Sequence, residues 1–279
     1  MISSNLLSVV TFVYGAAAFL YIAAWVFKNG LSGKLAGWIS LGAVAGNTIG
    51  IALRWMESYQ IGIGHAPLSN MYESLVFFAW TTGVIHIVIE KKYKIPVFGA
   101  FAMPIIFLAM AYASLSPDVN SSINPLVPAL KSNWLIAHVV TCFLGYAAFA
   151  LAFGLSLMYL MKLKSPVESQ GLLARLPEIG IIDGLTYQMV MFGFLFLSAG
   201  IITGAVWANS AWGSYWTWDP KETWSLITWF VYATLLHARM MRGWSGKRIA
   251  VLSIIGFAAV LFTYFGVNYL SGLHSYAKS

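Results

Sequence analysis

The sequence predicts an all-α membrane protein, a polytopic bundle of about eight transmembrane helices with both termini on the outer side. Three observations support this prediction. Of the 279 residues, 59% are hydrophobic and only 9% are charged, whereas a soluble domain carries roughly a quarter charged residues. Eight segments are apolar over about the 20 residues that a bilayer-spanning helix needs. The 16 Lys and Arg residues are also unevenly divided between alternate connections.

The eight apolar segments are separated by charge, Pro, Asn or Gly, as expected where a chain leaves lipid. They cover approximately residues 5–27, 35–55, 71–89, 95–114, 134–161, 185–207, 222–241 and 249–270. The sequence contains no soluble domain and no obvious repeat, so we expect a single membrane domain over residues 1–279. The N-terminus lacks a basic region and a clear cleavage site, which favours a retained first span over a signal peptide.

The orientation follows from the Lys and Arg residues, because cytoplasmic loops are enriched in them. Twelve fall on one predicted side, namely Lys28, Lys34, Lys91, Lys92, Lys94, Lys162, Lys164, Arg175, Arg239, Arg242, Lys247 and Arg248. The other side holds Arg54, Lys131, Lys221 and Lys278. The richer side is therefore predicted to be cytoplasmic. These topology signals account for most of the net charge of +7, and nucleic acid is not an expected partner.

Cysteine chemistry is not expected to contribute to function. The one cysteine, Cys142, lies in an apolar run. It can form neither a disulfide within the chain nor a CxxC metal or redox site. We therefore expect it to behave as a small hydrophobic residue.

The most unusual outer segment runs from Trp207 to Trp224 and reads WANSAWGSYWTWDPKETW. Its last residues have the pattern of a helix start. Asp219 can cap the following helix, Pro220 suits the first helical position, and Glu222 stands three residues after the cap. We expect this helix-start role for Asp219 and Glu222, with a further functional role in addition.

The five Trp residues of this segment have two interpretations. Aromatic residues often form a belt at the level of the lipid headgroups, and such a belt explains Trp55, Trp134 and Trp207. It does not explain the close spacing of Trp212, Trp216 and Trp218 within one connection. We therefore interpret the segment as a platform for a planar, partly apolar ligand.

Two histidines are predicted at the same outer level as this platform. His138 lies about one turn into the fifth span, and His274 follows the end of the eighth. Two imidazoles on separate elements could ligate a haem iron from its two axial sides. His65 is also predicted to be outside and remains an alternative ligand.

His237 is predicted to lie much deeper. It follows Glu222 by fifteen residues on the seventh span, which is about 22 Å at 1.5 Å per helical residue. An ionisable side chain within a bilayer is a functional candidate. A haem at that depth would need a second ligand. His86 is a candidate because it lies at a similar depth, although a partner protein is the favoured source.

These residues together resemble the CcsA/ResC family, the haem-handling component of the system II pathway of cytochrome c biogenesis. The main match is WGSYWTWDPKETW at 212–224, which is similar to the family's tryptophan-rich WWD signature. Further matches are SNWLIAHV at 132–139, LLHAR at 235–239, GLHSY at 272–276 and APLSNMYESLVFFAW at 66–80. The resemblance covers nearly the whole chain.

The resemblance implies a cofactor-binding set. His138 and His274 would be the axial ligands of haem b at the outer surface, and His237 would be a membrane-embedded ligand. The macrocycle would lie against Trp212, Trp216, Trp218 and Trp224, with Asp219 in the same motif. Arg54, Lys131 and Lys221 are candidate partners for the haem propionates. No catalytic residue is identified.

The resemblance also implies partners and a location. A ResB/CcsB-type membrane protein would supply the second inner ligand, and apocytochrome c would bring its CxxCH thiols to the haem vinyl groups; thiol-reducing proteins are further candidates. The chain would act as a subunit of a cytochrome c synthase in a bacterial plasma membrane or a thylakoid membrane, with its WWD loop on the extracytoplasmic side.

Two other functions remain open on sequence grounds. A haem exporter without synthase activity has the same features, and only a thioether assay separates the two. A quinone-linked membrane cytochrome usually carries pairs of His on the same two helices. Here each histidine stands alone on its span, which argues against the cytochrome. A related system I haem handler is disfavoured by the eight-span layout.

Overall fold

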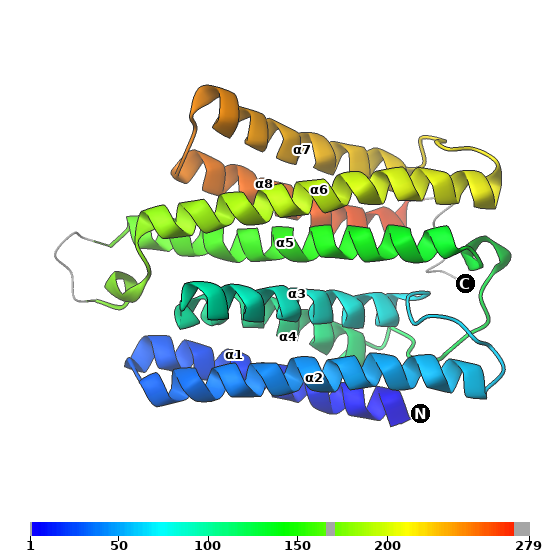
Figure 1. Cartoon of the computed structure of the whole chain (residues 1–279), viewed down its shortest axis with the longest axis horizontal. Helices are drawn as coiled ribbons and strands as arrows, with labels where there is room; N and C mark the ends of the chain where they lie inside the picture. Colours follow the sequence, from blue (N-terminus) through cyan, green and yellow to red (C-terminus); the bar gives the residue numbers. More distant parts are fainter. Residues whose placement is uncertain (1, 166–170, 271–279) are drawn as a thin grey trace. The chain divides into compact units, whose positions relative to one another are not determined.

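A computed structural model of the chain describes residues 2–165 and 171–270, and all regular structure in these two ranges is helical (Figure 1). The long helices are α1 (Ile2–Phe27), α2 (Gly30–Gln60), α3 (Met71–Tyr93), α4 (Gly99–Leu115), α5 (Asn133–Leu163), α6 (Ile179–Trp212), α7 (Pro220–Arg242) and α8 (Lys247–Tyr264). Short 3-10 turns follow at η1 (Pro96–Phe98), η2 (Pro128–Leu130), η3 (Leu172–Arg175) and η4 (Gly266–Tyr269).

Each of the eight apolar segments expected from the sequence corresponds to one long helix, which confirms the all-α membrane fold. Seven of these helices, α4 being taken together with η1, are long and apolar enough to cross a bilayer. The exception is α7, whose middle mixes Thr, Trp, Tyr and His with its apolar residues. The side of the membrane on which the termini lie stays a prediction.

The helices form two compact units. The first contains α1 to α4 together with η3, and the second contains α5 to α8 with η2 and η4. Within each unit, successive helices run in opposite directions (Figure 1). We call the ends that carry the α2–α3, α4–α5 and α6–α7 connections the predicted outer ends. The expectation of one functional domain over residues 1–279 remains a prediction.

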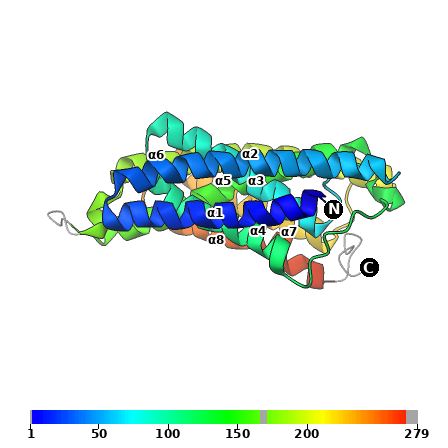
Figure 2. The same cartoon turned by 90° about the horizontal axis from the view of Figure 1, so that it is seen from below.

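In the first unit, α1 packs against α2 and α4, and α3 packs against α2 and α4. Figure 2 shows α1 and α2 side by side along their length. The interior of this unit includes the fully buried Tyr14, Tyr21 and Tyr72. Its polar atoms are used in contacts between helices: the Asn47 amide donates to the Tyr14 hydroxyl and to the Val76 carbonyl, each at 3.4 Å.

The η3 segment belongs to this first unit although it lies between α5 and α6 in the chain. Its Arg175 Nη1 donates to the carbonyls of Trp25 at 2.9 Å and Val26 at 2.6 Å. In return, Trp25 Nε1 donates to the Leu172 carbonyl at 3.1 Å. Helix carbonyls in a last turn lack partners within the helix, so Arg175 caps the end of α1.

In the second unit, α5 packs along α6 and α8, and α7 packs against α6 and α8. The rings of Phe149 on α5 and Tyr232 on α7 stack face to face, with centroids 3.5 Å apart. Arg239 on α7 pairs with Asp183 on α6 at 2.7 Å. These contacts place α7 against the rest of its unit despite its lower hydropathy.

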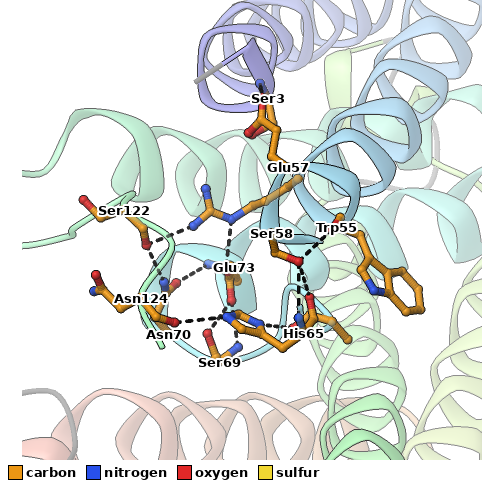
Figure 3. Close-up of polar contacts among 12 residues, drawn as sticks. Ser3, Trp55, Glu57, Ser58, His65, Ser69, Asn70, Glu73, Ser122 and Asn124 are labelled. Atoms are coloured by element: carbon orange, nitrogen blue, oxygen red, sulfur yellow. Dashed lines mark hydrogen bonds and ion pairs between the residues drawn. The ribbon is translucent and has the colours of Figure 1, made fainter. Parts of the chain in front are cut away.

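A polar cluster closes the predicted outer end of the first unit (Figure 3). Arg54, only 1% exposed, donates through Nε to Glu73 at 2.7 Å and through Nη2 to the Ser122 carbonyl at 3.1 Å. Glu73 also accepts from the backbone and hydroxyl of Ser69, both at 2.8 Å. The Asn70 side chain accepts from Glu73 N at 2.9 Å and caps α3. The Arg54 charge can be buried at this end because it is paired with the opposite charge of Glu73.

Removal of the Glu73 charge should destabilise the first unit strongly. Glu73→Gln leaves the buried Arg54 guanidinium without a counter-charge, and breaking a buried pair in this way costs about 3–5 kcal/mol. Thermal unfolding of the detergent-solubilised protein measures the loss. The matched control is Glu57→Gln, because Glu57 is half-buried on α2 and accepts from Ser3 N at 3.0 Å without facing a buried cation. That change should cost about 1 kcal/mol, and equal losses for the two variants would contradict the argument.

Candidate functional site

The tryptophan-rich segment is built from the ends of two helices and a short connection. Helix α6 continues to Trp212, five residues beyond the predicted end of the sixth span. It stops at Gly213, whose φ of 77° is the left-handed conformation that glycine adopts without steric cost. Helix α7 then begins at Pro220. The non-helical part is therefore residues 213–219, shorter than the loop expected from the sequence.

The helix start predicted at Asp219 is confirmed. Asp219 accepts from Lys221 N at 2.9 Å, and together with Glu222 it forms a capping box. Glu222 also accepts from Thr217 N at 2.7 Å and from Asp219 N at 3.2 Å. One carboxylate therefore holds two backbone groups of the connection and fixes its path into α7.

Trp218 is held in an uncommon backbone conformation. Its φ is 58°, a region that bulky residues rarely occupy and that costs of order 1–3 kcal/mol. This conformation is stabilised by the hydrogen bonds from Thr217 N and Asp219 N to Glu222. The Thr223 hydroxyl also donates to the Trp218 carbonyl at 3.2 Å. Its indole is 68% exposed and meets the half-buried Trp216 edge to face, with centroids 5.7 Å apart. A rigid loop thus presents Trp218 outward.

His138 on α5 connects to this aromatic group through Trp207. The imidazole and the Trp207 indole lie nearly parallel, with centroids 5.8 Å apart and planes inclined by 16°. Trp207 in turn meets Trp212 edge to face at 4.9 Å. His138 Nδ1 lies 2.8 Å from the Gly200 carbonyl on α6. The structure therefore links His138 to Trp212 through Trp207, while Trp224 packs instead on Phe262 of α8, with ring centroids 4.1 Å apart.

Trp207 has a different role from the one expected. The sequence assigned it to an interfacial belt, but it is only 3% exposed and donates Nε1–H to the Ala129 carbonyl at 2.8 Å. A signal was present in the spacing of Gly200, Gly204 and Trp207, because residues at i, i+4 and i+7 share one helix face. That face meets His138.

The other histidines fall into three situations. His237 is exposed on the surface of α7, where a partner can reach it. His86 on α3 is 0% exposed and lies against the rings of Tyr21 and Phe98, so it is not presented to a ligand outside the first unit. His274 lies outside the described residues.

His65 is excluded as an alternative iron ligand in this conformation. It is buried, and its Nδ1 and Nε2 lie 2.8 Å and 3.1 Å from the carbonyls of Ala66 and Asn124. Figure 3 shows the ring between its own loop and Asn124. A neutral imidazole has one N–H and one lone pair, and both ring nitrogens of His65 face carbonyl oxygens, so neither is directed at a metal. His65 instead fastens the α4–α5 connection to the first unit.

The basic residues expected near haem propionates also differ from one another. Arg54 is not an exposed partner, because it is buried and paired with Glu73. Lys131 is exposed, and Lys221 is half-buried in the first turn of α7. Of the three, Lys131 and Lys221 remain candidates for pairing with propionates.

The chain belongs to the family of cytochrome c assembly proteins, because the model of the family described as "Cytochrome C assembly protein" matches residues 68–274. Curated relatives called cytochrome c biogenesis protein CcsA narrow this to the CcsA family. The protein of Prochlorococcus marinus is 42% identical over an alignment 255 positions long, gaps included, which covers 82% of this chain and 79% of that protein. The protein of Pyropia yezoensis is 38% identical over an alignment 312 positions long, gaps included, which covers 96% of each chain.

A solved structure has a similar fold. The chain matches a structure called cytochrome c heme lyase CcmF with a TM-score of 0.69 and 16% sequence identity. The match covers 95% of this chain and 46% of CcmF, so the chain spans less than half of that protein. At this identity the likeness concerns the fold alone.

Loss of the Glu222 carboxylate should loosen the connection at 213–219. Glu222→Ala removes the acceptor of two backbone N–H groups, and loss of a helix cap costs about 0.5–2 kcal/mol. Amide hydrogen exchange in peptides covering 213–219 should become faster. The control is Glu178→Ala, because Glu178 stands at the N-cap of α6, is exposed and makes no capping bond with its side chain. Unchanged exchange in Glu222→Ala would show that other contacts hold the loop.

Proposed function

We propose that this protein delivers haem across the membrane and presents it for covalent attachment to apocytochrome c, together with a ResB/CcsB-type partner. Its family acts in cytochrome c biogenesis, a process that handles haem because haem is what the cytochrome must acquire. The route of the haem, its ligands and its partners in this chain are parts of the proposal. Haem is the substrate in transit and not a resident cofactor.

One observation carries the outer site: the contact of His138 Nδ1 with the Gly200 carbonyl at 2.8 Å. A carbonyl can only accept, so in the neutral imidazole Nδ1 holds the proton and Nε2 holds the lone pair. Histidines that ligate metals usually donate their other N–H to a carbonyl or carboxylate. The arrangement at His138 is that of a ligand prepared for iron.

The aromatic residues fit the same substrate. The exposed Trp218 and half-buried Trp216 and Trp212 offer flat apolar surfaces close to the predicted outer end of α7. A porphyrin has two large flat faces, and stacking on indoles buries them with little loss of side-chain freedom. Trp212 connects to His138 through Trp207, which supports a shared site.

The inner ligand in this proposal is His237. Its exposure on α7 suits an imidazole that completes its site with a residue from another protein. A lone ionisable side chain on a membrane helix is costly unless it has a function or a partner. The ResB/CcsB-type partner would supply the second axial ligand.

The chemistry at the outer site is thioether formation. Each thiol of the apocytochrome CxxCH motif adds across one haem vinyl group, so that sulfur bonds to one vinyl carbon and hydrogen to the other. Two neutral imidazoles favour low-spin, six-coordinate iron and leave no position for oxygen. The histidine of CxxCH would then replace one of the two outer ligands and carry the haem away with the cytochrome.

The membrane orientation is the first test. If the Lys and Arg asymmetry sets the topology, Cys introduced at the exposed Asp118 should react with a membrane-impermeant maleimide in intact cells. Cys at the exposed Ser245 should react only after the membrane is opened. Cys142 is buried and is replaced by Ala in both variants. The reverse pattern would put the WWD segment on the cytoplasmic side and overturn the proposal.

The second test separates an iron ligand from the stacking surface. His138→Ala removes a bond to iron, so retained outer haem should lose its bis-imidazole spectrum, and added imidazole should restore it. Trp218→Ala removes only stacking, worth roughly 1.5–3 kcal/mol for a large side chain. That variant should bind haem about 10- to 100-fold more weakly, with an unchanged spectrum per haem retained.

The control for both variants is Trp38→Ala, since Trp38 is an exposed tryptophan of α2 in the first unit. Thioether yield in the apocytochrome, measured beside haem content, separates a synthase subunit from a haem exporter. An unchanged bis-imidazole spectrum in His138→Ala would disprove His138 as a ligand. Transport of haem without partner-dependent thioether formation would favour the exporter.

A further inference from the structure

Three residues of α6 form a slot for the His138 ring. Gly200, Gly204 and Trp207 lie at i, i+4 and i+7 and so follow one another along one face of the helix. Each residue acts on the imidazole differently. The Gly200 carbonyl lies at hydrogen-bond distance from it, Gly204 leaves space for it because it has no side chain, and the Trp207 indole lies nearly parallel to it. We call these three residues the α6 slot.

The carbonyl of Gly200 sets the protonation of the ring. It accepts from His138 Nδ1 at 2.8 Å and also from the Thr203 hydroxyl at 3.2 Å. Cys142 Sγ lies 3.6 Å from the same nitrogen, and sulfur is a weak acceptor, so the carbonyl is the main partner. The proton of neutral His138 is thereby held on Nδ1.

Gly204 makes the approach of the ring possible. A Cβ atom at this position would lie 2.6 Å from His138 Nδ1 and 2.7 Å from Cε1. Contacts of that length do not occur between real side chains, so any residue other than glycine would push the ring out. The neighbouring Gly200 is equally close to α5, because a Cβ there would lie 2.6 Å from Cys142 Sγ.

Trp207 limits the rotation of the ring. Its indole lies nearly parallel to the imidazole and is itself fixed by its bond to the Ala129 carbonyl and by the edge of Trp212. Because Trp207 is almost fully buried, its indole is not free to turn out into solvent. The orientation of the imidazole plane is thus set from the α6 side.

We propose that Gly200, Gly204 and Trp207 are positioning residues that set the tautomer and plane of His138, and through them its strength as an iron ligand. This inference rests on the proposed function, in which His138 binds haem. An N–H bond from the far ring nitrogen to a carbonyl makes the ligating nitrogen more basic. A more basic ligand stabilises ferric iron, so the slot lowers the reduction potential of the outer haem.

The decisive variant is Gly204→Ala in the full chain, purified with its partner from haem-replete cells. Displacement of the ring should weaken retention of outer haem by about 10- to 100-fold, the usual cost of disturbing such supporting contacts. The remaining haem should have a higher reduction potential. Added imidazole should restore the six-coordinate spectrum without restoring the potential, because free imidazole lacks the bond to Gly200.

The matched control is Gly184→Ala on the same helix, where an added Cβ meets nothing within 4 Å. It should retain haem and potential as in the unaltered protein. If Gly204→Ala behaves like Gly184→Ala, the inference is wrong. Haem held through His237 reports whether Gly204→Ala is folded, since a general folding defect removes both haems.

Two further variants decide the matter if Gly204→Ala does not fold. Trp207→Phe keeps an aromatic ring over His138, and Trp207→Leu removes it. The potential of the outer haem should rise in the Leu variant much more than in the Phe variant, and equal potentials would overturn the inference. His138→Ala separates the two proposals. An unchanged outer haem spectrum in that variant would contradict the proposed function itself. A changed spectrum in His138→Ala, together with no effect of the Gly204 and Trp207 variants, would contradict only the positioning role.

Discussion

Polar groups that enter a bilayer must find partners within the protein, and this constraint shapes both units of the chain. The buried Arg54 is paired with Glu73, and the half-buried Arg239 is paired with Asp183. Some uncharged groups also find a partner on another helix: Trp229 donates to the Ser198 hydroxyl at 2.8 Å, and the Thr228 and Thr263 hydroxyls lie 3.0 Å apart. These contacts join different helices. The hydrogen bonds that offset the cost of burying polar groups therefore also fix how the helices pack.

The same constraint explains the surroundings of His138. A histidine inside a helical bundle needs an acceptor for its N–H, and a helix carbonyl is reachable only where the neighbouring helix has no side chain in the way. Gly200 and Gly204 satisfy that condition on α6. The small residues therefore serve the chemistry of the ring as well as the approach of the helices, and Trp207 closes the arrangement from one side.

Much of the fold was predictable because its determinants are local. Apolar length located each helix, and the order Asp219, Pro220, Glu222 indicated the start of α7. The end of α6 was not predictable in the same way, because residues 208–211 are small or polar and fit a loop or a helix equally; only the left-handed Gly213 stops it. The roles of Trp207 and His65 depend on partners far away in the sequence. Spacing alone placed His138 near the aromatic segment but contained no information on its tautomer.

The docking of η3 on α1 makes the first unit discontinuous in the chain. Its four long helices are synthesised first, but Arg175, which caps the Trp25 and Val26 carbonyls, follows only after the whole of α5. The end of α1 must therefore wait for a later part of the polypeptide. If the chain were cut between α4 and α5, the N-terminal fragment would lack Arg175. The C-terminal fragment would contain Arg175 but not the α1 carbonyls that it caps. The two units are thus coupled by the order of synthesis, whatever their arrangement in space.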